Sequence, residues 1–485
     1  MKTNVLQTFS REKSRKLWSY TVSLLGLSLL TVASAPSVFA ATKDLTLDAI
    51  FTSNTFAADL PTAPRWLSSG DAFTYLETVA AGTVVRVMRV GDTEPELLLA
   101  LADLPGLPTG FQATDVTWSE ESGFALIKGV PGTTWEGYEE AAYYVWDPER
   151  EAAWPLVSAR KKLRLVKMAP DGRSIGFVDG NNLYVVETAS GDMRAITTDG
   201  GEDIFNGIFD YGSTEFGPRG AWFWSPDGRN IAFWRLDATS VPFYSMIDRL
   251  PGYPEVRRFH YPNTEQAHAS YQVGVYALDT GKTRWLETGH DVDDYLPHLS
   301  WFPSSEGLFV QRLTRDHQIL DVLRFDLSTT GAQRMVRDTQ PTWLDVTLDM
   351  IPLSNEAFLW SSEKTGWRHI YLCRVDAGCD QLTDGDWSMD ELLAVDPDGD
   401  WVYFYAKRDS LIDQHVYRVP LAGGAVEHVT DQPGWHVCRS LREQSGRWRR
   451  TLPPPRLRPC PWSALLALIS APSWKTPCPN WLTTR

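Results

Sequence analysis

Hydrophobic and polar residues alternate in short runs along most of this chain, and turn residues separate the runs. In the clearest run, Ile231 and Phe233 fall on one side of the alternation, while Ala232 and Trp234 fall on the other. Alternation with a period of two predicts a β-strand, and apolar residues in both sets predict a strand buried on both faces. The pattern therefore predicts an all-β fold.

One unit recurs along the chain: an aromatic or Ser-Pro entry, a tight Asp-Gly turn, an alternating strand and a second strand ending near Asp and Gly. Asp171-Gly172, Asp227-Gly228 and Asp398-Gly399 supply the residue with positive φ that such a turn requires. Seven copies begin at or near Trp66, Trp118, Met168, Trp222, Trp301, Pro352 and Ala394. This repetition predicts a β-propeller, in which four-stranded blades surround a channel. A β-sandwich array is the structural alternative.

Composition narrows the class of protein. The chain has 485 residues, of which 12% are aromatic and 21 are Trp, as suits large side chains packed between sheets. A net charge of −15, without a basic stripe in the body, argues against binding to nucleic acid. No cofactor motif is present.

Residues 1–40 have the pattern of a secretory signal peptide. A basic segment precedes an apolar run, and Val38-Phe39-Ala40 provides a cleavage site. We therefore expect export to the periplasm or the extracellular space. The alternative is an uncleaved signal that anchors the protein to the membrane.

The body of the chain has two cysteines, Cys373 and Cys379. They could pair across a hairpin or remain reduced, and their spacing makes a poor zinc site, so no metal is expected.

From Val437 to Arg485 the composition changes abruptly. Eight Arg and one Lys accompany the single Glu443, so this segment carries +8 while residues 1–436 carry −23. Such a switch is typical of translation in a shifted reading frame, and we expect residues 437–485 to be a disordered, aberrant tail. A natural basic C-terminal arm is the alternative.

Several segments carry a more specific likeness. They are LTLDAIF from Leu45, NGIFDYGSTEFG from Asn206, WFWSPDGRNIAFWRLDATSVPFYSMID from Trp222, RRFHYPNTEQAHASYQVGVYALDTGK from Arg257, SSEKTGWRHIYL from Ser361 and QLTDGDW from Gln381. In this order they resemble the N-terminal region of the dipeptidyl peptidase IV family, in the prolyl oligopeptidase group of serine peptidases. The resemblance runs from about Leu45 to His436, and we interpret residues 41–436 as one propeller domain.

The resemblance implies an eight-bladed propeller followed by an α/β-hydrolase domain with a Ser-Asp-His triad that releases N-terminal dipeptides. The last blade would start near Pro433. The one Gly-x-Ser-x-Gly pentapeptide of the printed sequence, Gly172-Arg173-Ser174-Ile175-Gly176, belongs to an Asp-Gly repeat turn and not to the strand-to-helix corner that a nucleophile requires, so we expect the hydrolase domain to be absent from this sequence. Nothing suggests that His298, His369 and Asp386 converge on a triad, and His369 suits a structural role. No catalytic residue is assigned.

In the family, two adjacent Glu bind the free amino group of the substrate, because carboxylates give charge-assisted hydrogen bonds to an amine. The matching stretch here is one residue short, so the pair reads as Thr214-Glu215, with Asp210 at the start of the loop. A family Arg that reaches a substrate carbonyl is matched by Glu136, which cannot donate that bond. A solvated acidic loop is the other interpretation of Glu136, Glu139 and Glu140.

The sequence therefore predicts the substrate-gating propeller of a secreted serine exopeptidase, inactive alone, whose partners in the full-length parent are peptide N-termini and a second copy in a homodimer. Whether the chain should be counted as an enzyme stays open. The alternative is a non-catalytic periplasmic or extracellular propeller that binds peptides or proteins.

Overall fold

The computed structural model divides the chain into two compact units, Met1–Ala58 and Asp59–Arg485. The described residues are 46–53, 62–102, 104–158, 162–210, 216, 220–289, 293–329, 331–396, 399–430 and 432–436. The predicted signal peptide and basic tail lie outside them. In the first unit, Thr46 caps helix α1 (Leu47–Phe51) by accepting a hydrogen bond from Ala49 N at 3.1 Å. Within the described ranges, no helix is both long enough and apolar enough to span a membrane.

The described part of the second unit contains eight antiparallel sheets. Seven of them we number in sequence order as blades 1 to 7, and the eighth is a separate two-stranded hairpin. The strands of blades 1 and 2 are β1 (Thr62–Trp66), β2 (Ala72–Val79), β3 (Gly82–Arg89) and β4 (Glu96–Ala100), then β5 (Ala113–Trp118), β6 (Ala125–Gly129), β9 (Tyr143–Asp147) and β10 (Ala152–Pro155). Those of blades 3 and 4 are β11 (Leu163–Met168), β12 (Ser174–Asp179), β13 (Asn182–Glu187) and β14 (Met193–Ala195), then β15 (Ile204–Asn206), β16 (Trp222–Trp224), β17 (Asn230–Asp237), β20 (Ser270–Ala277) and β21 (Lys282–Trp285).

Blades 5, 6 and 7 have four strands each. They are β22 (Leu299–Trp301), β23 (Gly307–Leu313), β24 (Ile319–Asp326) and β25 (Gln333–Thr339); β26 (Met350–Pro352), β27 (Ala357–Ser362), β28 (His369–Arg374) and β29 (Gly378–Gln381); and β30 (Met389–Val395), β31 (Trp401–Ala406), β32 (His415–Pro420) and β33 (Glu427–His428). Two hairpins are inserted between strands, β7 (Gly132–Thr133) with β8 (Glu139–Ala141), and β18 (Phe243–Asp248) with β19 (Glu255–His260).

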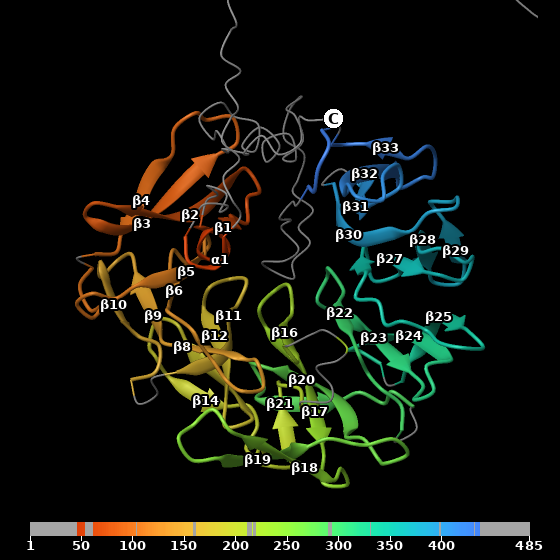
Figure 1. Cartoon of the computed structure of the whole chain (residues 1–485), viewed down its shortest axis with the longest axis horizontal. Coiled ribbons are helices and arrows are strands. Elements are labelled where there is room, and N and C mark those ends of the chain that lie inside the picture. The colour runs from red at the N-terminus through yellow and green to blue at the C-terminus, as the bar shows by residue number, and fades with distance from the viewer. Residues whose placement is uncertain are drawn as a thin grey trace, which may run out of the picture. The chain divides into compact units, whose positions relative to one another are not determined.

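The blades of the second unit follow one another around a central region, from β1–β4 to β30–β33 (Figure 1). Each predicted repeat start falls in an opening strand of one blade: Trp66, Trp118, Met168, Trp222, Trp301, Pro352 and Ala394 lie in β1, β5, β11, β16, β22, β26 and β30. The prediction of an all-β propeller with seven recognisable blades is therefore confirmed.

Strand β17 shows why both sets of alternating positions are apolar. Phe233 packs in a cluster with Val185 of blade 3, whereas Trp234 packs in a cluster with Leu308 of blade 5. Both β17 side chains are almost completely buried. Full burial of a large apolar side chain contributes about 1.5–3 kcal/mol, so face-to-face stacking of blades supplies much of the stability.

The Asp-Gly turns connect the first two long strands of a blade. Gly172 and Gly228 both have φ of +73°, a conformation that disfavours residues with a Cβ. Each glycine N–H donates to a carbonyl three residues earlier, at 2.8 and 2.9 Å. Asp398 lies outside the described residues, but the following Gly399 has φ of +77°. The predicted turn chemistry is therefore present.

Because strands within a blade alternate in direction, the propeller has two different faces. The turn face holds the turns between first and second strands and between third and fourth strands. The loop face holds the other connections and both inserted hairpins. The well-exposed large apolar side chains of the described loop face are Val130, Trp135, Phe243, Tyr244, Met246, Ile247, Leu250, Tyr253, Val256, Trp343, Leu348, Trp367, Leu411, Ile412 and Trp435.

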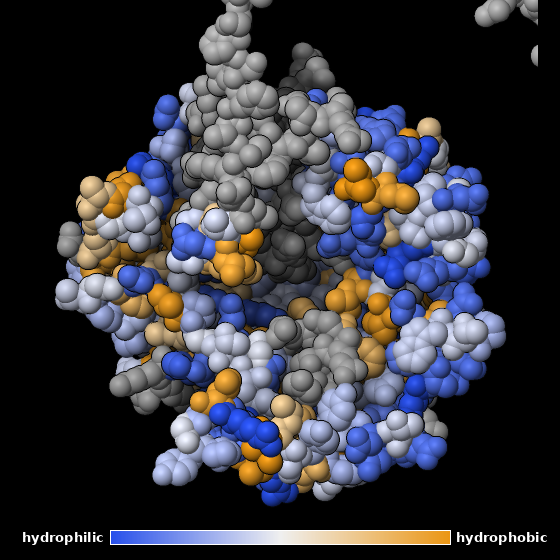
Figure 2. All heavy atoms as spheres, in the orientation of Figure 1, coloured by the Kyte–Doolittle hydropathy of each residue, from blue (hydrophilic) through white to orange (hydrophobic). Residues whose placement is uncertain are grey.

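No described turn of the turn face carries such a side chain. Hydrophobic side chains gather near the lower edge of the view in Figure 2, where Figure 1 places β18 and β19. Exposed apolar surface marks sites of interaction, so the loop face is the face suited to ligands and partners.

One link between blades recurs three times. Asn206 N donates to Asn181 O at 3.1 Å, Met389 N to Arg368 O at 2.9 Å, and His436 N to Gln414 O at 3.0 Å. In the first two copies, this bond joins the start of one sheet to the preceding blade. The third copy lies at residues 432–436, where the sequence predicts the start of a further blade.

Candidate functional site

A pocket of about 180 Å³ opens on the loop face where blades 3 and 4 meet both inserted hairpins. Glu136 enters its wall from the turn between β7 and β8, Asp210 from the segment after β15, and Arg258 from β19. Aromatic rings make up much of the remaining wall, namely Trp135, Tyr138, Phe205, Phe209, Phe243 and Phe259. The pocket thus combines charged groups with apolar surface, as ligand sites do.

A tight turn presents Glu136 to the pocket. Gly137 N donates to Thr134 O at 2.9 Å, and Thr134 N donates to Tyr138 O at 2.8 Å. Gly137 has φ of +86°, which only glycine adopts readily. This conformation places Trp135 and Glu136 at the tip of the turn.

Two contacts fix the tip against the rest of the pocket. Tyr138 donates a hydrogen bond from its hydroxyl to Phe209 O at 3.0 Å. The Trp135 ring packs on the Phe259 ring with 4.8 Å between centroids. Three segments that are distant in sequence therefore form one site.

The core sets the position of Asp210. The preceding Phe209 is buried and lies 5.4 Å from Trp234, ring to ring. Asp210 itself is only 4% exposed. A carboxylate held this deep in a pocket is fixed before a ligand arrives, which lowers the cost of binding.

The structure brings together two of the four predicted site residues. Glu136 and Asp210 line the same pocket although 74 positions separate them. Thr214 and Glu215 lie outside the described residues. Glu139 and Glu140, which the other interpretation groups with Glu136 in an acidic loop, lie on β8 and pair with Lys128 at 2.5 Å and with Lys162 at 2.6 Å.

Sequence reasoning missed the basic side of this pocket. Arg164 on β11 donates to Asn181 Oδ1 at 3.3 Å, and the Arg258 guanidinium lies 4.4 Å from the centre of the Phe243 ring. His260 contacts Val241 O at 2.7 Å and Asp203 Oδ1 at 2.9 Å. The motif RRFHYP contains two of these residues, but only the fold shows which side chains face the pocket.

Lys167 on β11 was also missed. Its Nζ donates to Trp222 O at 2.5 Å and lies 4.7 Å from the Trp222 ring and 4.3 Å from the Phe223 ring. Burial disfavours the charged ammonium and lowers the pKa of Lys167 to about 7. This amine therefore titrates near neutral pH.

The histidine considered for catalysis has structural contacts. His369 is buried, and its ring contacts Thr383 Oγ1 and Gly385 O, each at 3.1 Å. His415 and Thr430 repeat the first contact in blade 7 at 3.2 Å. The sequence signal for this contact is a His-x-Tyr segment followed by Thr-Asp, which occurs once in each of the two blades.

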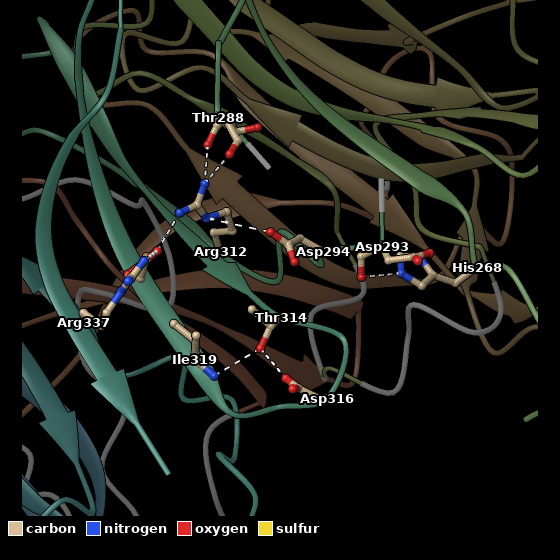
Figure 3. A network of polar contacts seen from close by, with 11 residues as sticks. His268, Thr288, Asp293, Asp294, Arg312, Thr314, Asp316, Ile319 and Arg337 are labelled. Atoms are coloured by element: carbon tan, nitrogen blue, oxygen red, sulfur yellow. Dashed lines mark hydrogen bonds and ion pairs between the residues drawn. The ribbon is translucent and has the colours of Figure 1, made fainter. Parts of the chain in front are cut away.

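A polar network joins segments of blades 4 and 5 (Figure 3). Arg312 donates to Asp321 Oδ2 at 2.6 Å and to Thr288 O at 3.0 Å. His268 contacts Asp293 O at 2.8 Å, and Thr314 Oγ1 donates to Asp316 at 2.6 Å. These bonds hold connecting segments in place, so we assign the network a structural role.

Cys373 and Cys379 form a disulfide across β28 and β29, which decides between the two predicted alternatives. Among the described residues, no group of His, Cys, Asp and Glu is arranged to hold a metal ion.

Comparison with known proteins connects this site to a family. The model of the dipeptidyl peptidase IV N-terminal region matches residues 121–447. The chain belongs to the dipeptidyl peptidase IV family. The match includes Glu136, Asp210 and the loop-face pocket, and it confirms the resemblance seen in the sequence.

Relatives of this dipeptidyl peptidase IV family chain include dipeptidyl peptidase 4 of Arthroderma otae, which is 26% identical over 74% of the chain and 48% of the relative. A probable dipeptidyl peptidase 4 of Aspergillus flavus is 26% identical over 76% and 50%. The chain thus spans about half the length of these curated relatives.

Among solved structures, dipeptidyl peptidase 4 of Porphyromonas gingivalis matches the fold with a TM-score of 0.75 at 23% identity. The match covers 82% of this chain and 57% of that protein.

Proposed function

We propose that this chain forms the substrate-gating propeller of an exported serine exopeptidase of the dipeptidyl peptidase IV type. In this role, the propeller binds the free N-terminus of a peptide and so sets how far that peptide extends into the enzyme. The observation that carries the proposal is the meeting of Glu136 and Asp210 in one aromatic-walled pocket on the loop face. Carboxylates in such a site give charge-assisted hydrogen bonds to an ammonium group.

Asp210 is the residue on which we base the amine contact, together with Thr214 and Glu215, which follow it in sequence. Glu136 replaces the carbonyl-binding Arg that the resemblance implies, so a second carboxylate faces the ligand. This arrangement suits a divergent exopeptidase that contacts its substrate differently from the family pattern.

We further propose that residues 1–485 bind peptide but do not hydrolyse it, because the one Gly-x-Ser-x-Gly pentapeptide, around Ser174, lies in the hairpin of β11 and β12 and not at a strand-to-helix corner. Purified chain is expected to leave an Ala-Pro chromogenic amide intact. Turnover that a serine-directed fluorophosphonate abolishes would show that this is wrong.

Calorimetric titration with an Ala-Pro-containing hexapeptide tests the binding role. The free peptide should bind at least tenfold more tightly than its N-acetylated form, and Asp210→Asn should remove the difference. The matched control is Asp316→Asn, an exposed carboxylate outside the pocket. Equal affinity for both peptides would contradict the proposal.

Export and self-association complete the proposal. The disulfide Cys373–Cys379 suits an oxidising compartment.

The hairpin β18–β19 is the surface that best suits a second copy, since Ile247, Leu250 and Tyr253 are 56%, 96% and 88% exposed. Sedimentation velocity should show a dimer that Ile247→Asp dissociates, and a monomeric wild type would exclude it.

The exposed apolar residues of the loop face also favour the second candidate, a propeller that binds proteins without chemistry. Sequencing the gene across the codons for Gly434 to Arg439 separates the two candidates. If another frame downstream encodes Gly-x-Ser-x-Gly followed by Asp and His, the exopeptidase is supported. If none does, the binding propeller is the better account.

A further inference from the structure

The loop-face pocket has an unusual charge arrangement. Its wall carries two guanidinium groups, Arg164 and Arg258, together with three carboxylates, Glu136, Glu202 and Asp210. In the described part of the chain, neither arginine lies within 4.0 Å of a carboxylate oxygen, and Glu136 and Glu202 lie that close to no basic group. Two arginines and two glutamates therefore face one small cavity, and among the described residues none of these four groups is neutralised by an ion pair.

Several other arginines of the propeller do pair with a carboxylate. Arg257, the residue before Arg258 on β19, pairs with Asp248 Oδ2 at 2.9 Å. Arg235 pairs with Asp199 Oδ2 at 2.8 Å. Successive side chains of a strand point to opposite faces, so Arg257 meets its partner on one side of the hairpin while Arg258 is left facing the pocket.

The remaining hydrogen-bonding capacity of the two arginines is large. A guanidinium group has five N–H donors. The single bond from Arg164 to Asn181 uses one of them, and Arg258 contacts the Phe243 ring. Both groups are thereby positioned by neutral partners and keep donors for a carboxylate, for which the planar guanidinium is well suited.

The mixture of charges selects the class of ligand. A purely cationic ligand would be repelled by two guanidinium groups, and a purely anionic one by three carboxylates. A ligand with an ammonium group at one end and a carboxylate at the other satisfies both sets. Two residues of extended peptide span about 7 Å, which fits a cavity of about 180 Å³.

We propose that this pocket binds short peptides, of two or three residues, by both free ends. The ammonium group contacts Glu136 and Asp210, the terminal carboxylate contacts Arg164 and Arg258, and the aromatic wall covers the side chains. The inference rests on the proposed function for the amine end, and it adds recognition of the carboxylate end. Dipeptides, the products of the proposed exopeptidase, belong to this class.

The test compares four ligands by calorimetric titration of the full chain: Ala-Pro, Ala-Pro amide, N-acetyl-Ala-Pro and an Ala-Pro-containing hexapeptide. We expect amidation and acetylation each to weaken binding of the dipeptide at least tenfold. Arg164→Met and Arg258→Met should each weaken Ala-Pro at least fivefold and leave Ala-Pro amide unchanged. Arg257→Met is the matched control on the neighbouring position and should bind Ala-Pro like the wild type.

The outcomes separate the two proposals. If acetylation weakens binding and amidation does not, recognition of the carboxylate end is wrong while the proposed function stands. If neither modification matters, or if no peptide binds, both are wrong. The comparison of ligands on the wild-type chain needs no variant, so misfolding of an arginine variant would leave the test decisive.

Discussion

Asp321 on β24 and Arg337 on β25 face each other across two strands of blade 5 and share two hydrogen bonds, at 2.7 and 2.8 Å. Arg312 adds a third bond to the same carboxylate at 2.6 Å. The Asp321 side chain is only 2% exposed, so these bonds replace its contacts with water. Through its bond with Arg312, this carboxylate is part of the polar network shown in Figure 3.

Asp321→Asn is expected to lower the free energy of unfolding by about 3 kcal/mol, because it leaves two guanidinium groups without their buried partner. Urea unfolding at pH 7, followed by tryptophan fluorescence, measures the loss. The matched control is Asp380→Asn, since Asp380 pairs with Arg374 at the same 2.7 Å but both side chains are exposed. Asp380→Asn should lower the free energy of unfolding by less than about 1 kcal/mol.

The bonds of Asp321 with Arg337 and Arg312 also make the stability of the fold depend on pH. Burial alone would raise the pKa of Asp321, but hydrogen bonds from Arg337 and Arg312 outweigh burial and lower this pKa. A carboxylate with a lowered folded-state pKa stabilises the fold above its unfolded pKa of about 3.9 and loses that contribution as the pH falls. The difference in stability between wild type and Asp321→Asn should therefore shrink below pH 4. A difference that stays constant down to pH 2 would contradict this origin.

Lys167→Met is expected to remove a second pH dependence of stability, which acts at neutral and alkaline pH. The unfolded lysine keeps its proton up to about pH 10.4, whereas the folded pKa is about 7. The unfolded state thus binds more protons between these values, and wild-type stability gains a contribution that rises with pH. Chemical unfolding at pH 7, 8.5 and 10 should show this slope in the wild type and a smaller slope in the variant.

Lys364→Met controls for the loss of a lysine that lies over an aromatic ring at the surface, 3.9 Å from the Tyr371 ring centre. Equal slopes for wild type and Lys167→Met would rule out this role of Lys167.

Thr383→Val tests the contact between a histidine ring and a threonine hydroxyl that recurs within blades 6 and 7. Thr383 Oγ1 accepts a hydrogen bond from Ile370 N at 3.0 Å and contacts His369, and all three residues are buried. Valine keeps the shape but leaves a buried N–H without a partner, so about 2 kcal/mol of unfolding free energy should be lost. Thermal and urea unfolding measure the loss. Thr383→Ser keeps the hydroxyl and should lose less than half as much; equal losses would point to packing instead.

Reduction of the Cys373–Cys379 disulfide should destabilise the propeller modestly. The bond closes a loop with a sequence separation of only 6, for which loop closure contributes about 2 kcal/mol. Urea unfolding with and without a reductant measures the difference. The double variant Cys373→Ser/Cys379→Ser should be insensitive to reductant, because the remaining cysteines are outside this hairpin. A reductant effect that persists in the variant would assign it elsewhere.

Much of the fold could be predicted because it depends on neighbours in sequence. Alternation in β17 and the glycine at 228 each act within a few residues, so strands, turns and seven blades follow from local patterns. The order of six motifs was enough to indicate the family. Asp210 and Glu136 could be named for the same reason, since each sits in a motif.

The tertiary structure alone decided how these residues act. Glu136 and Asp210 meet in one pocket because Tyr138 bonds to Phe209 O and Trp135 packs on Phe259, contacts that bridge distant parts of the chain. Arg164 and Arg258 face the same cavity without a carboxylate partner, and no local pattern encodes that. The sequence by itself determined which strands and turns form and which family they belong to. Packing between blades decided which charged side chains are neutralised by a partner and which remain available to a ligand.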